Sequence, residues 1–224
     1  MKINILVPTH DVIPAMFAYD LGQLMSYTTN EMPKDTAIGL AFVTGTYIHK
    51  ARQELMLHAL EDGDDYILWL DSDMRFPRET LHALLQHRVT MVGANYAKRS
   101  LPTEPVAIKH IGDGEHPAER LHQTPFDEDM QAEGLVEVES IGFGAVLMRM
   151  DKFHALPPLT EGPWFDQVYH ADTDEWYGED VNFCRLIRKK LGIKIFVDRD
   201  LSRVMGHIGQ FDYMLDAVPE RVEA

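Results

Sequence analysis

The sequence predicts an α/β protein whose mostly parallel, twisted sheet is flanked by helices. Short apolar runs alternate along the chain with segments of helical periodicity, which is the order that produces a parallel sheet. The run at residues 66–70, Tyr-Ile-Leu-Trp-Leu, is apolar or aromatic at every position and is bounded by Asp-rich sequence and by Pro77. Such a run is typical of a strand that is covered on both faces, as strands in parallel sheets are.

The expected elements follow one another without a linker-like boundary. Apolar runs predict strands at residues 3–7, 36–44, 66–70, 90–95, 140–149 and 193–198. Helical patterns predict helices at residues 47–63, 78–87 and 178–192, and a helix is also expected near each of the first two strands. In the first of these helices Ile48, Ala51 and Leu55 recur at spacings of three and four. Residues 110–134 are polar, acidic and irregular, which predicts a long loop or lid.

Composition limits the class of protein. The 224 residues and the 45% hydrophobic content fit one globular domain with a sizeable core. The formal net charge of −15 disfavours broad affinity for nucleic acid. The single cysteine, Cys184, excludes an intrachain disulfide and a zinc site of several cysteines, and it fits a reducing compartment. Because no stretch reads as a membrane span, we expect a cytoplasmic protein.

Two carboxylates, Asp71 and Asp73, stand one residue apart directly after the apolar run at residues 66–70. In open α/β sheets ligands bind outside the carboxyl ends of the strands, so acids in this position are candidate ligand groups. Carboxylate oxygens are hard ligands that suit Mg²⁺ or Mn²⁺, and such an ion commonly bridges to the phosphates of a bound nucleotide. The alternative is a simple Asx turn after a strand.

Two later segments also carry candidate chemistry. Glu179 and Asp180 follow Gly178 at the start of a predicted helix, where a carboxylate can accept a proton from an acceptor hydroxyl. The alternative for both acids is favourable placement at a helix N-terminus without any catalytic role. His207 lies between two glycines after the last predicted strand, and the alternative to a ligand role there is a structural or exposed histidine.

The order of these features resembles the GT-A fold of nucleotide-sugar-dependent glycosyltransferases. A strand, Asp-x-Asp, a long loop, a Gly-rich strand, Trp-x-Gly-Glu-Asp and Met-x-His succeed one another. Residues 176–180, Trp-Tyr-Gly-Glu-Asp, are similar to the Trp-Gly-Gly-Glu-Asp element of the β-1,4-galactosyltransferases, with Tyr177 in place of the first glycine. The resemblance covers residues 1–210 as one GT-A-like domain, which leaves residues 211–224 as a C-terminal tail.

This resemblance implies transfer of a sugar from a nucleoside-diphosphate sugar, with a UDP-sugar favoured, to an acceptor hydroxyl. The implied ligands of Mn²⁺ or Mg²⁺ are Asp71, Asp73 and His207. The implied catalytic residues are Asp180, as the base of an inverting reaction, and Glu179. The acceptor does not follow from the resemblance, because Tyr177 alters the matching element. Glycans, small metabolites, proteins and hydroxylated bases in viral DNA all remain open as acceptors.

Contacts to the donor are expected from several parts of the chain. Arg52 lies at the edge of the buried stripe of its helix, where its guanidinium would meet either a structural carboxylate or the donor diphosphate. Gly142-Phe143-Gly144 stands inside an apolar strand, which favours close approach of a ligand to the backbone or, alternatively, a bulge. The full set of expected donor-binding residues is Pro8, Thr9, His10, Arg52, Asp71, Ser72, Gly142, Gly144 and Trp176.

Three alternatives stand beside a metal-dependent inverting enzyme. A retaining glycosyltransferase with the same metal site would need no base at Glu179 or Asp180. A nucleotidyltransferase shares the sheet and the acidic ligands, but it normally opens with a Gly-rich, basic phosphate loop that residues 6–15 lack. A nonenzymatic nucleotide-sugar-binding module would use the same crevice without turnover.

Overall fold

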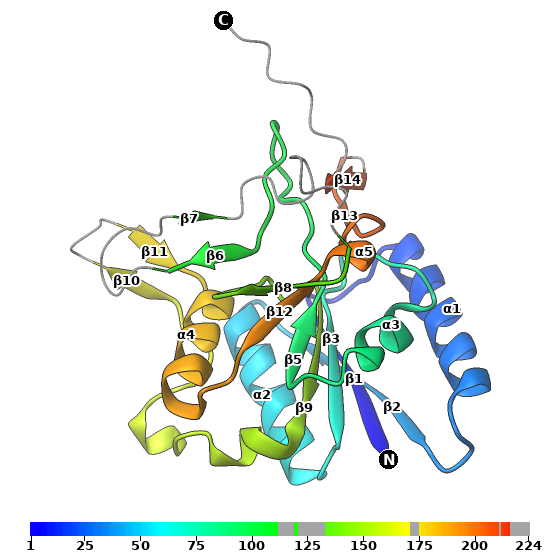
Figure 1. Cartoon of the computed structure of the whole chain (residues 1–224), viewed down its shortest axis with the longest axis horizontal. Coiled ribbons are helices and arrows are strands. Elements are labelled where there is room, and N and C mark those ends of the chain that lie inside the picture. Colours follow the sequence, from blue (N-terminus) through cyan, green and yellow to red (C-terminus); the bar gives the residue numbers. More distant parts are fainter. Residues whose placement is uncertain (112–118, 121–132, 171–174, 211, 216–224) are drawn as a thin grey trace, which may run out of the picture.

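Figure 1 shows the structure of the chain, a computed structural model. It describes residues 1–111, 119–120, 133–170, 175–210 and 212–215. A seven-stranded sheet forms the centre, in the order β2-β1-β3-β9-β5-β12-β8. Its strands are β1 (Lys2–Thr9), β2 (Ala37–Thr44), β3 (Tyr66–Leu70), β5 (Met91–Gly93), β8 (Leu135–Val138), β9 (Ala145–Arg149) and β12 (Ile195–Asp198).

Five of the seven strands run in the same direction. β1 pairs in parallel with β2 and β3, and β12 pairs in parallel with β5. β9 runs antiparallel between β3 and β5, which gives those two strands a common direction, and β8 runs antiparallel beside β12. The predicted α/β class with a mostly parallel sheet is therefore confirmed.

Helices cover both faces of this sheet (Figure 1). α1 and α3 share one apolar layer, and α2 and α4 share the other. The helices are α1 (Ala15–Glu31), α2 (Ile48–Glu61), α3 (Thr80–Gln86), α4 (Glu179–Leu191) and α5 (Arg199–Ser202), with short 3₁₀ helices η2 (Met150–Ala155) and η3 (Leu159–Glu161).

β3 shows why its sequence is apolar throughout. Ile67 and Trp69 belong to the apolar layer under α2 and α4, whereas Leu68 and Leu70 belong to the layer under α1 and α3. Successive side chains of a strand point to opposite faces, so a strand with both faces covered needs apolar residues at every position. The ring of Trp69 also packs edge-on against Phe143, with 5.8 Å between the centroids.

Three small sheets lie outside the central one and were not predicted. β14 (Asp212–Met214), β13 (Gly206–Ile208) and β4 (Met74–Arg75) form a three-stranded sheet in that order. The other two are hairpins, β10 (Val168–His170) with β11 (Glu175–Tyr177) and β6 (Ile108–His110) with β7 (Glu119–Arg120). The expected tail from residue 211 thus includes a strand. The predicted loop at 110–134 lies largely outside the described residues.

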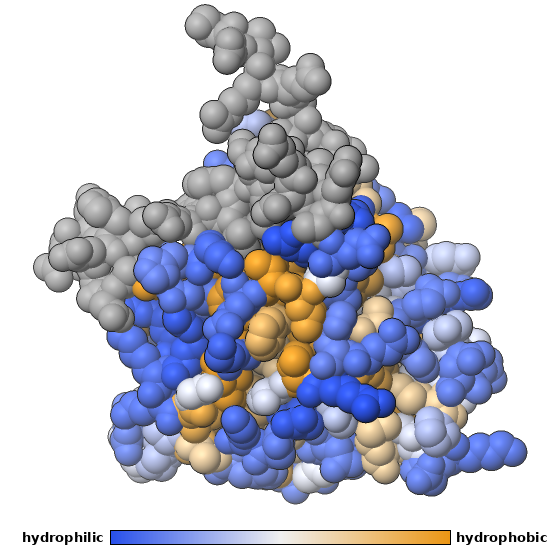
Figure 2. All heavy atoms as spheres, in the orientation of Figure 1, coloured by the Kyte–Doolittle hydropathy of each residue, from blue (hydrophilic) through white to orange (hydrophobic). Residues whose placement is uncertain are grey.

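In the coloured part of Figure 2, hydrophilic residues cover most of the visible face, apart from an apolar strip near the middle of the view. Within the described ranges, none of the helices combines the length and the apolar character that crossing a membrane requires.

Candidate active site

The carboxyl ends of β1 and β3 meet at one edge of the sheet, because the two strands are parallel neighbours. A cavity of about 380 Å³ opens there. Seven of the predicted site residues line it: Pro8, Thr9, His10, Arg52, Asp71, Ser72 and Asp73. The lining also includes Gly45, Thr46, Ile48, Ala51 and Arg99.

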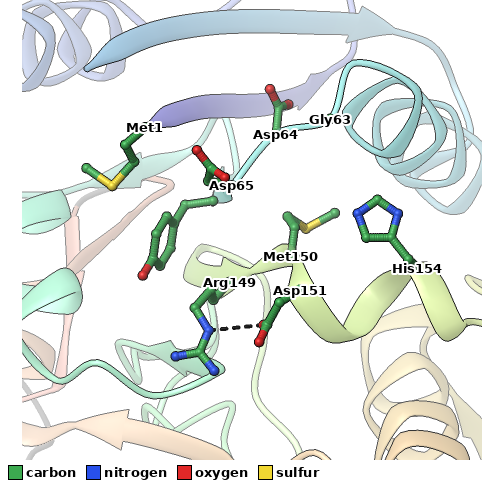
Figure 3. Close-up of a pocket in the computed structure, with 9 residues that line it drawn as sticks. Met1, Gly63, Asp64, Asp65, Arg149, Met150, Asp151 and His154 are labelled. Atoms are coloured by element: carbon green, nitrogen blue, oxygen red, sulfur yellow. Dashed lines mark hydrogen bonds and ion pairs between the residues drawn. The ribbon is translucent and has the colours of Figure 1, made fainter. Parts of the chain in front are cut away.

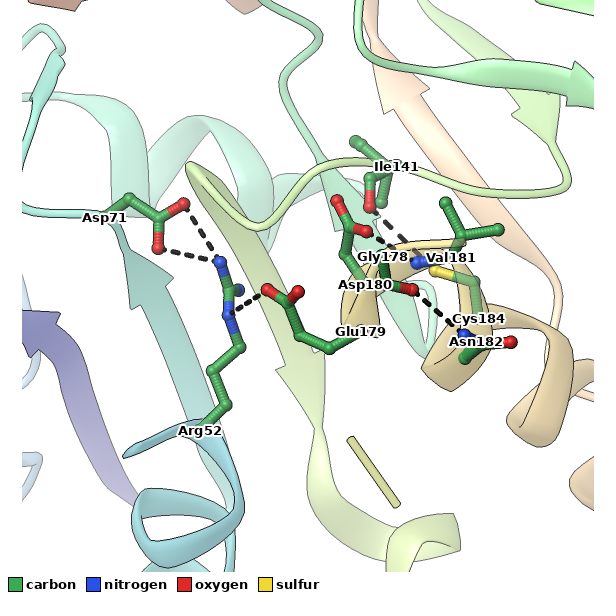
Figure 4. Close-up of polar contacts among 9 residues, drawn as sticks. All are labelled: Arg52, Asp71, Ile141, Gly178, Glu179, Asp180, Val181, Asn182 and Cys184. Carbon is green, nitrogen blue, oxygen red and sulfur yellow. Dashed lines mark hydrogen bonds and ion pairs between the residues drawn. The ribbon is translucent and has the colours of Figure 1, made fainter. Parts of the chain in front are cut away.

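Arg52 of α2 connects the end of β3 to the start of α4 (Figure 4). Its Nη2 donates to both carboxylate oxygens of Asp71, at 3.0 and 3.1 Å, and its Nε lies 3.2 Å from Oε1 of Glu179. Only 3% of Arg52 is exposed, and its guanidinium lies over the ring of Phe143, 4.8 Å from the centroid. The structural ion pair expected for Arg52 is therefore present, while a contact between Arg52 and a donor stays a prediction.

The charge of one guanidinium interacts with the charges of three carboxyls here. We call these residues the Arg52 cluster: Arg52, Asp71, Glu179 and Asp180. Burial lowers the pKa of Arg52, but the three carboxyls together raise it above its ordinary value. Burial raises the pKa of Asp71, and Arg52 offsets this only in part. The pKa values of both partners of this ion pair are thus raised, that of Asp71 chiefly by burial and that of Arg52 by the several acids around it. The cluster holds more acid than Arg52 neutralises.

Asp180 stands in the first turn of α4, where its Oδ1 accepts a hydrogen bond from the backbone N–H of Val181 at 2.7 Å. Burial, followed by the negative charge of Glu179, raises the pKa of Asp180 to about 6. Although part of the residue reaches solvent, protein atoms crowd its carboxyl, and this crowding disfavours the charged form. A carboxyl with such a pKa is ionised at neutral pH and still takes up a proton readily, which suits a general base.

Asp73 lies in a second cluster with His207 and Arg99, which we call the Asp73 cluster. The pairing of β13 with β4 places His207 opposite Met74, next to Asp73. Nε2 of His207 and Nη1 of Arg99 lie 3.3 and 3.2 Å from the same Oδ2 of Asp73. Burial alone would raise the pKa of Asp73, but the hydrogen bond and charge of His207, with the charge of Arg99, lower it. Nδ1 of His207 lies 3.0 Å from the carbonyl oxygen of Ala97.

The predicted metal ligands are gathered only in part. Asp73 and His207 are in contact, whereas Asp71 is bound by Arg52. Across the described residues, no group of three His, Cys, Asp or Glu side chains is arranged to hold a metal. A carboxylate and an imidazole nevertheless suit Mn²⁺ as two ligands beside water or phosphate oxygens. The contact of Nδ1 with a backbone carbonyl makes Nε2 the nitrogen for such a role.

The expectation for Gly142 and Gly144 needs a correction. Both precede β9, which begins at Ala145, so they do not lie inside the strand. A Cβ at Gly142 would lie 2.5 Å from the Tyr96 hydroxyl oxygen, and a Cβ at Gly144 would lie 2.6 Å from the Tyr96 ring. Neither Cβ atom would fit while the Tyr96 ring keeps its position. The group that closely approaches the backbone at these two glycines is therefore the side chain of Tyr96.

Two further aromatic residues differ in their relation to the site, since Tyr96 contacts His207 whereas Trp176 is not among the residues that line the cavity. Tyr96, which was not predicted, packs edge-on against His207 with 5.4 Å between the ring centroids, and burial above all raises its pKa well above the ordinary value. Its only signal in the sequence is an aromatic residue directly after the predicted strand at 90–95. Trp176, a predicted donor contact, is 70% exposed on β11 and packs against Tyr169.

A second cavity, of about 490 Å³, lies at the opposite end of the sheet, beside the first residues of β1 and β3 (Figure 3). Its lining includes Asp65, Tyr66, Arg149, Asp151 and His154. Nε of Arg149 donates to Oδ1 of Asp151 at 3.0 Å, so the charges of these two side chains are already paired. Ligands of open α/β sheets bind at the carboxyl ends of strands, which makes the first cavity the stronger candidate.

No protein-family model and no curated protein matches this sequence. Among solved structures, the fold is similar to the crystal structure of A197 from STIV, with a TM-score of 0.56 and 12% identity over 100% of this chain and 99% of that chain. A glycosyltransferase involved in the glycosylation of the major capsid of PBCV-1 aligns with a TM-score of 0.34 and 12% identity, over 72% of this chain and 68% of that chain. The first likeness concerns the fold alone, and the second is too distant to support an argument about the site.

Proposed function

We propose that the protein is a metal-dependent glycosyltransferase that moves a sugar from a nucleoside-diphosphate sugar to an acceptor hydroxyl, with inversion at the anomeric carbon. The observation that carries this proposal is the cavity at the carboxyl ends of β1 and β3. Residues that the sequence assigns to the donor or the ion line it together, although they come from positions 8–10, 52 and 71–73. A crevice at this position is where open α/β sheets bind nucleotides.

The charges around the cavity favour a diphosphate that arrives with a cation. Asp71 and Asp73 both line the cavity and are paired there with Arg52 and Arg99, so little unpaired positive charge is left to hold a bare diphosphate. When bound at Asp73 and His207, Mn²⁺ or Mg²⁺ supplies positive charge for the departing nucleoside diphosphate. Arg99, whose side chain is 50% exposed, offers a guanidinium to phosphate oxygens at the same wall.

Asp180 is the proposed general base. Its pKa of about 6 leaves it ionised at neutral pH, and Glu179 beside it is engaged by Arg52. Asp180 would accept the hydroxyl proton as the acceptor oxygen bonds to the anomeric carbon and the bond to the diphosphate breaks. Attack from the face opposite the leaving group gives inversion. Glu179 acts through its charge, which helps to raise the pKa of Asp180.

The direct test incubates the protein with Mn²⁺ and a panel of nucleotide sugars, and identifies the nucleotide product. We expect release of nucleoside diphosphate that stops in excess EDTA. A parallel incubation supplies nucleoside triphosphates and sugar 1-phosphates, and release of pyrophosphate there would instead identify a nucleotidyltransferase. Binding of nucleotide sugars without turnover would identify a nonenzymatic module. Full turnover in EDTA would refute the metal requirement.

A further inference from the structure

β2 is an edge strand of the central sheet in the described part of the chain. It pairs with β1 over all eight of its residues, and it stands at the end of the strand order. None of the described strands pairs with its outer side. An edge strand of this length presents a row of backbone donors and acceptors to any strand that can lie beside it.

The backbone groups that face outward can be named from the pairing with β1. Ala37 N–H donates to the carbonyl oxygen of Met1, and Gly45 N–H donates to that of Thr9. Because strand geometry repeats every second residue, the odd-numbered residues of β2 direct their N–H and C=O groups toward β1. The residues that direct both groups outward are therefore Ile38, Leu40, Phe42 and Thr44.

The side chains of β2 do not hinder another strand from pairing with this edge. Leu40 is 39% exposed and Phe42 is 42% exposed, and both stand on the same face of the strand. No Asp, Glu, Lys or Arg occurs at residues 36–49, in a chain that is 25% charged, and β2 contains no proline. Edge strands of monomeric proteins are normally blunted by lysine, proline, a bulge or a covering segment. β2 lacks the first two, and its register with β1 is unbroken.

We propose that β2 pairs antiparallel with β2 of a second copy of this chain, which joins two central sheets across a two-fold axis at Ala41. In this register Leu40 stands opposite Phe42 of the second copy, and Ile38 stands opposite Thr44 of the second copy. All four outward-facing residues then form pairs that exchange both backbone hydrogen bonds. Opposite residues of antiparallel strands share a face, so the exposed Leu40 and Phe42 side chains cover one another.

Charge and pairing geometry favour a second copy over another partner. The backbone groups on the outer side of β2 can pair with the same groups of a second, antiparallel copy. Residues 36–49 contain no Asp, Glu, Lys or Arg that an acidic or basic partner could recognise. Two copies that each carry a formal −15 repel one another elsewhere, so salt should strengthen their association. Salt would weaken the binding of a basic segment. This proposal does not depend on the glycosyltransferase function.

The test is sedimentation equilibrium of the full chain at low and high salt, with two matched variants. Leu40→Lys places a charge on the edge, whereas Leu159→Lys makes the same change in η3 at a leucine of similar exposure, 41%. We expect a dimer that salt strengthens, an increase of at least about tenfold in the dissociation constant for Leu40→Lys, and no change for Leu159→Lys. A monomeric wild type, or a dimer that Leu40→Lys leaves intact, would overturn the proposal.

Amide hydrogen exchange on the wild type tests the register without any mutation. Protection of the N–H groups of Ile38, Leu40, Phe42 and Thr44 should rise with protein concentration. The N–H groups of Gly39, Ala41 and Val43 should stay protected at all concentrations, because they bond to β1. If the outward-facing amides exchange at the same rate at every concentration, β2 is not the interface.

Discussion

The two carboxylates of the Asp-Ser-Asp turn contact different partners, although a single residue separates them. Asp71 is bound by the buried guanidinium of Arg52, and its side chain is 20% exposed. Asp73 contacts His207 and Arg99 beside the cavity, and its side chain is 31% exposed. The pKa of Asp71 is raised, chiefly by burial, whereas the pKa of Asp73 is lowered. The turn thus supplies one acid that ties helices to the sheet and one that is suited to a ligand.

This difference teaches that an Asp-x-Asp pattern does not specify two equivalent metal ligands. Neighbouring side chains in a turn diverge, and each takes the charge that its own surroundings offer. The Arg52 cluster contains its own buried cation, which makes it a structural element. The proton transfer proposed for Asp180 would take place in the same cluster. The Asp73 cluster is more open and its imidazole is placed by strand pairing, which makes it the better candidate for an ion.

The largest effect is expected from Asp180→Asn in the Arg52 cluster. An amide cannot accept the acceptor proton, so kcat should fall by ~10²–10⁴-fold while donor affinity stays nearly unchanged. In the wild type, kcat/KM should rise with pH through about 6, because only ionised Asp180 acts as a base. Steady-state kinetics across pH measure both quantities.

Glu179→Gln is the matched control for this variant. Loss of activity in Glu179→Gln with retained activity in Asp180→Asn would mean that the base is the other carboxylate. Near-normal turnover in both variants would rule out base-catalysed inversion, and the anomeric configuration of the product, read by NMR, should then show retention.

Arg52→Ala and Arg99→Ala compare the two clusters by stability. Removing Arg52 leaves the largely buried carboxylates of Asp71 and Glu179 without a positively charged partner. The free energy of unfolding should therefore fall by about 3–5 kcal/mol. Removing the half-exposed Arg99 should lower it by less than ~1 kcal/mol. Urea denaturation measures both. Equal losses would show that the clusters do not differ in structural importance.

A smaller effect is expected in the pH dependence of stability. The folded protein raises the pKa of Asp180 from 3.8 to about 6, so folding favours its neutral form. That contribution is fully present below 3.8 and is lost as pH rises through about 6. Asp180→Asn should therefore gain stability relative to the wild type over this range, by at most about 3 kcal/mol. A difference that is constant with pH would show that Asp180 titrates normally.

Much of this arrangement could be predicted from the sequence, because local pattern and strand polarity determine it. The apolar run of β3 reveals its burial, and parallel strands bring their carboxyl ends together, which is why residues 8–10 and 71–73 line one cavity. The register that sets β9 against β3, pairing Tyr66 with Arg149, depends on contacts distant in sequence. The fit of Tyr96 against Gly142 and Gly144 depends on the equally distant pairing of β9 with β5, so a single sequence did not reveal it.

Calorimetric titration of UDP with Mn²⁺ into Asp73→Asn and Asp71→Asn tests most directly whether the two acids have different roles. We expect Asp73→Asn to weaken Mn²⁺-dependent UDP binding by at least about tenfold at nearly unchanged unfolding temperature. Asp71→Asn should retain most of this binding and unfold at a lower temperature, because Arg52 loses a charged partner. The account is contradicted if Asp73→Asn binds like the wild type, or if Asp71→Asn loses binding as completely as Asp73→Asn.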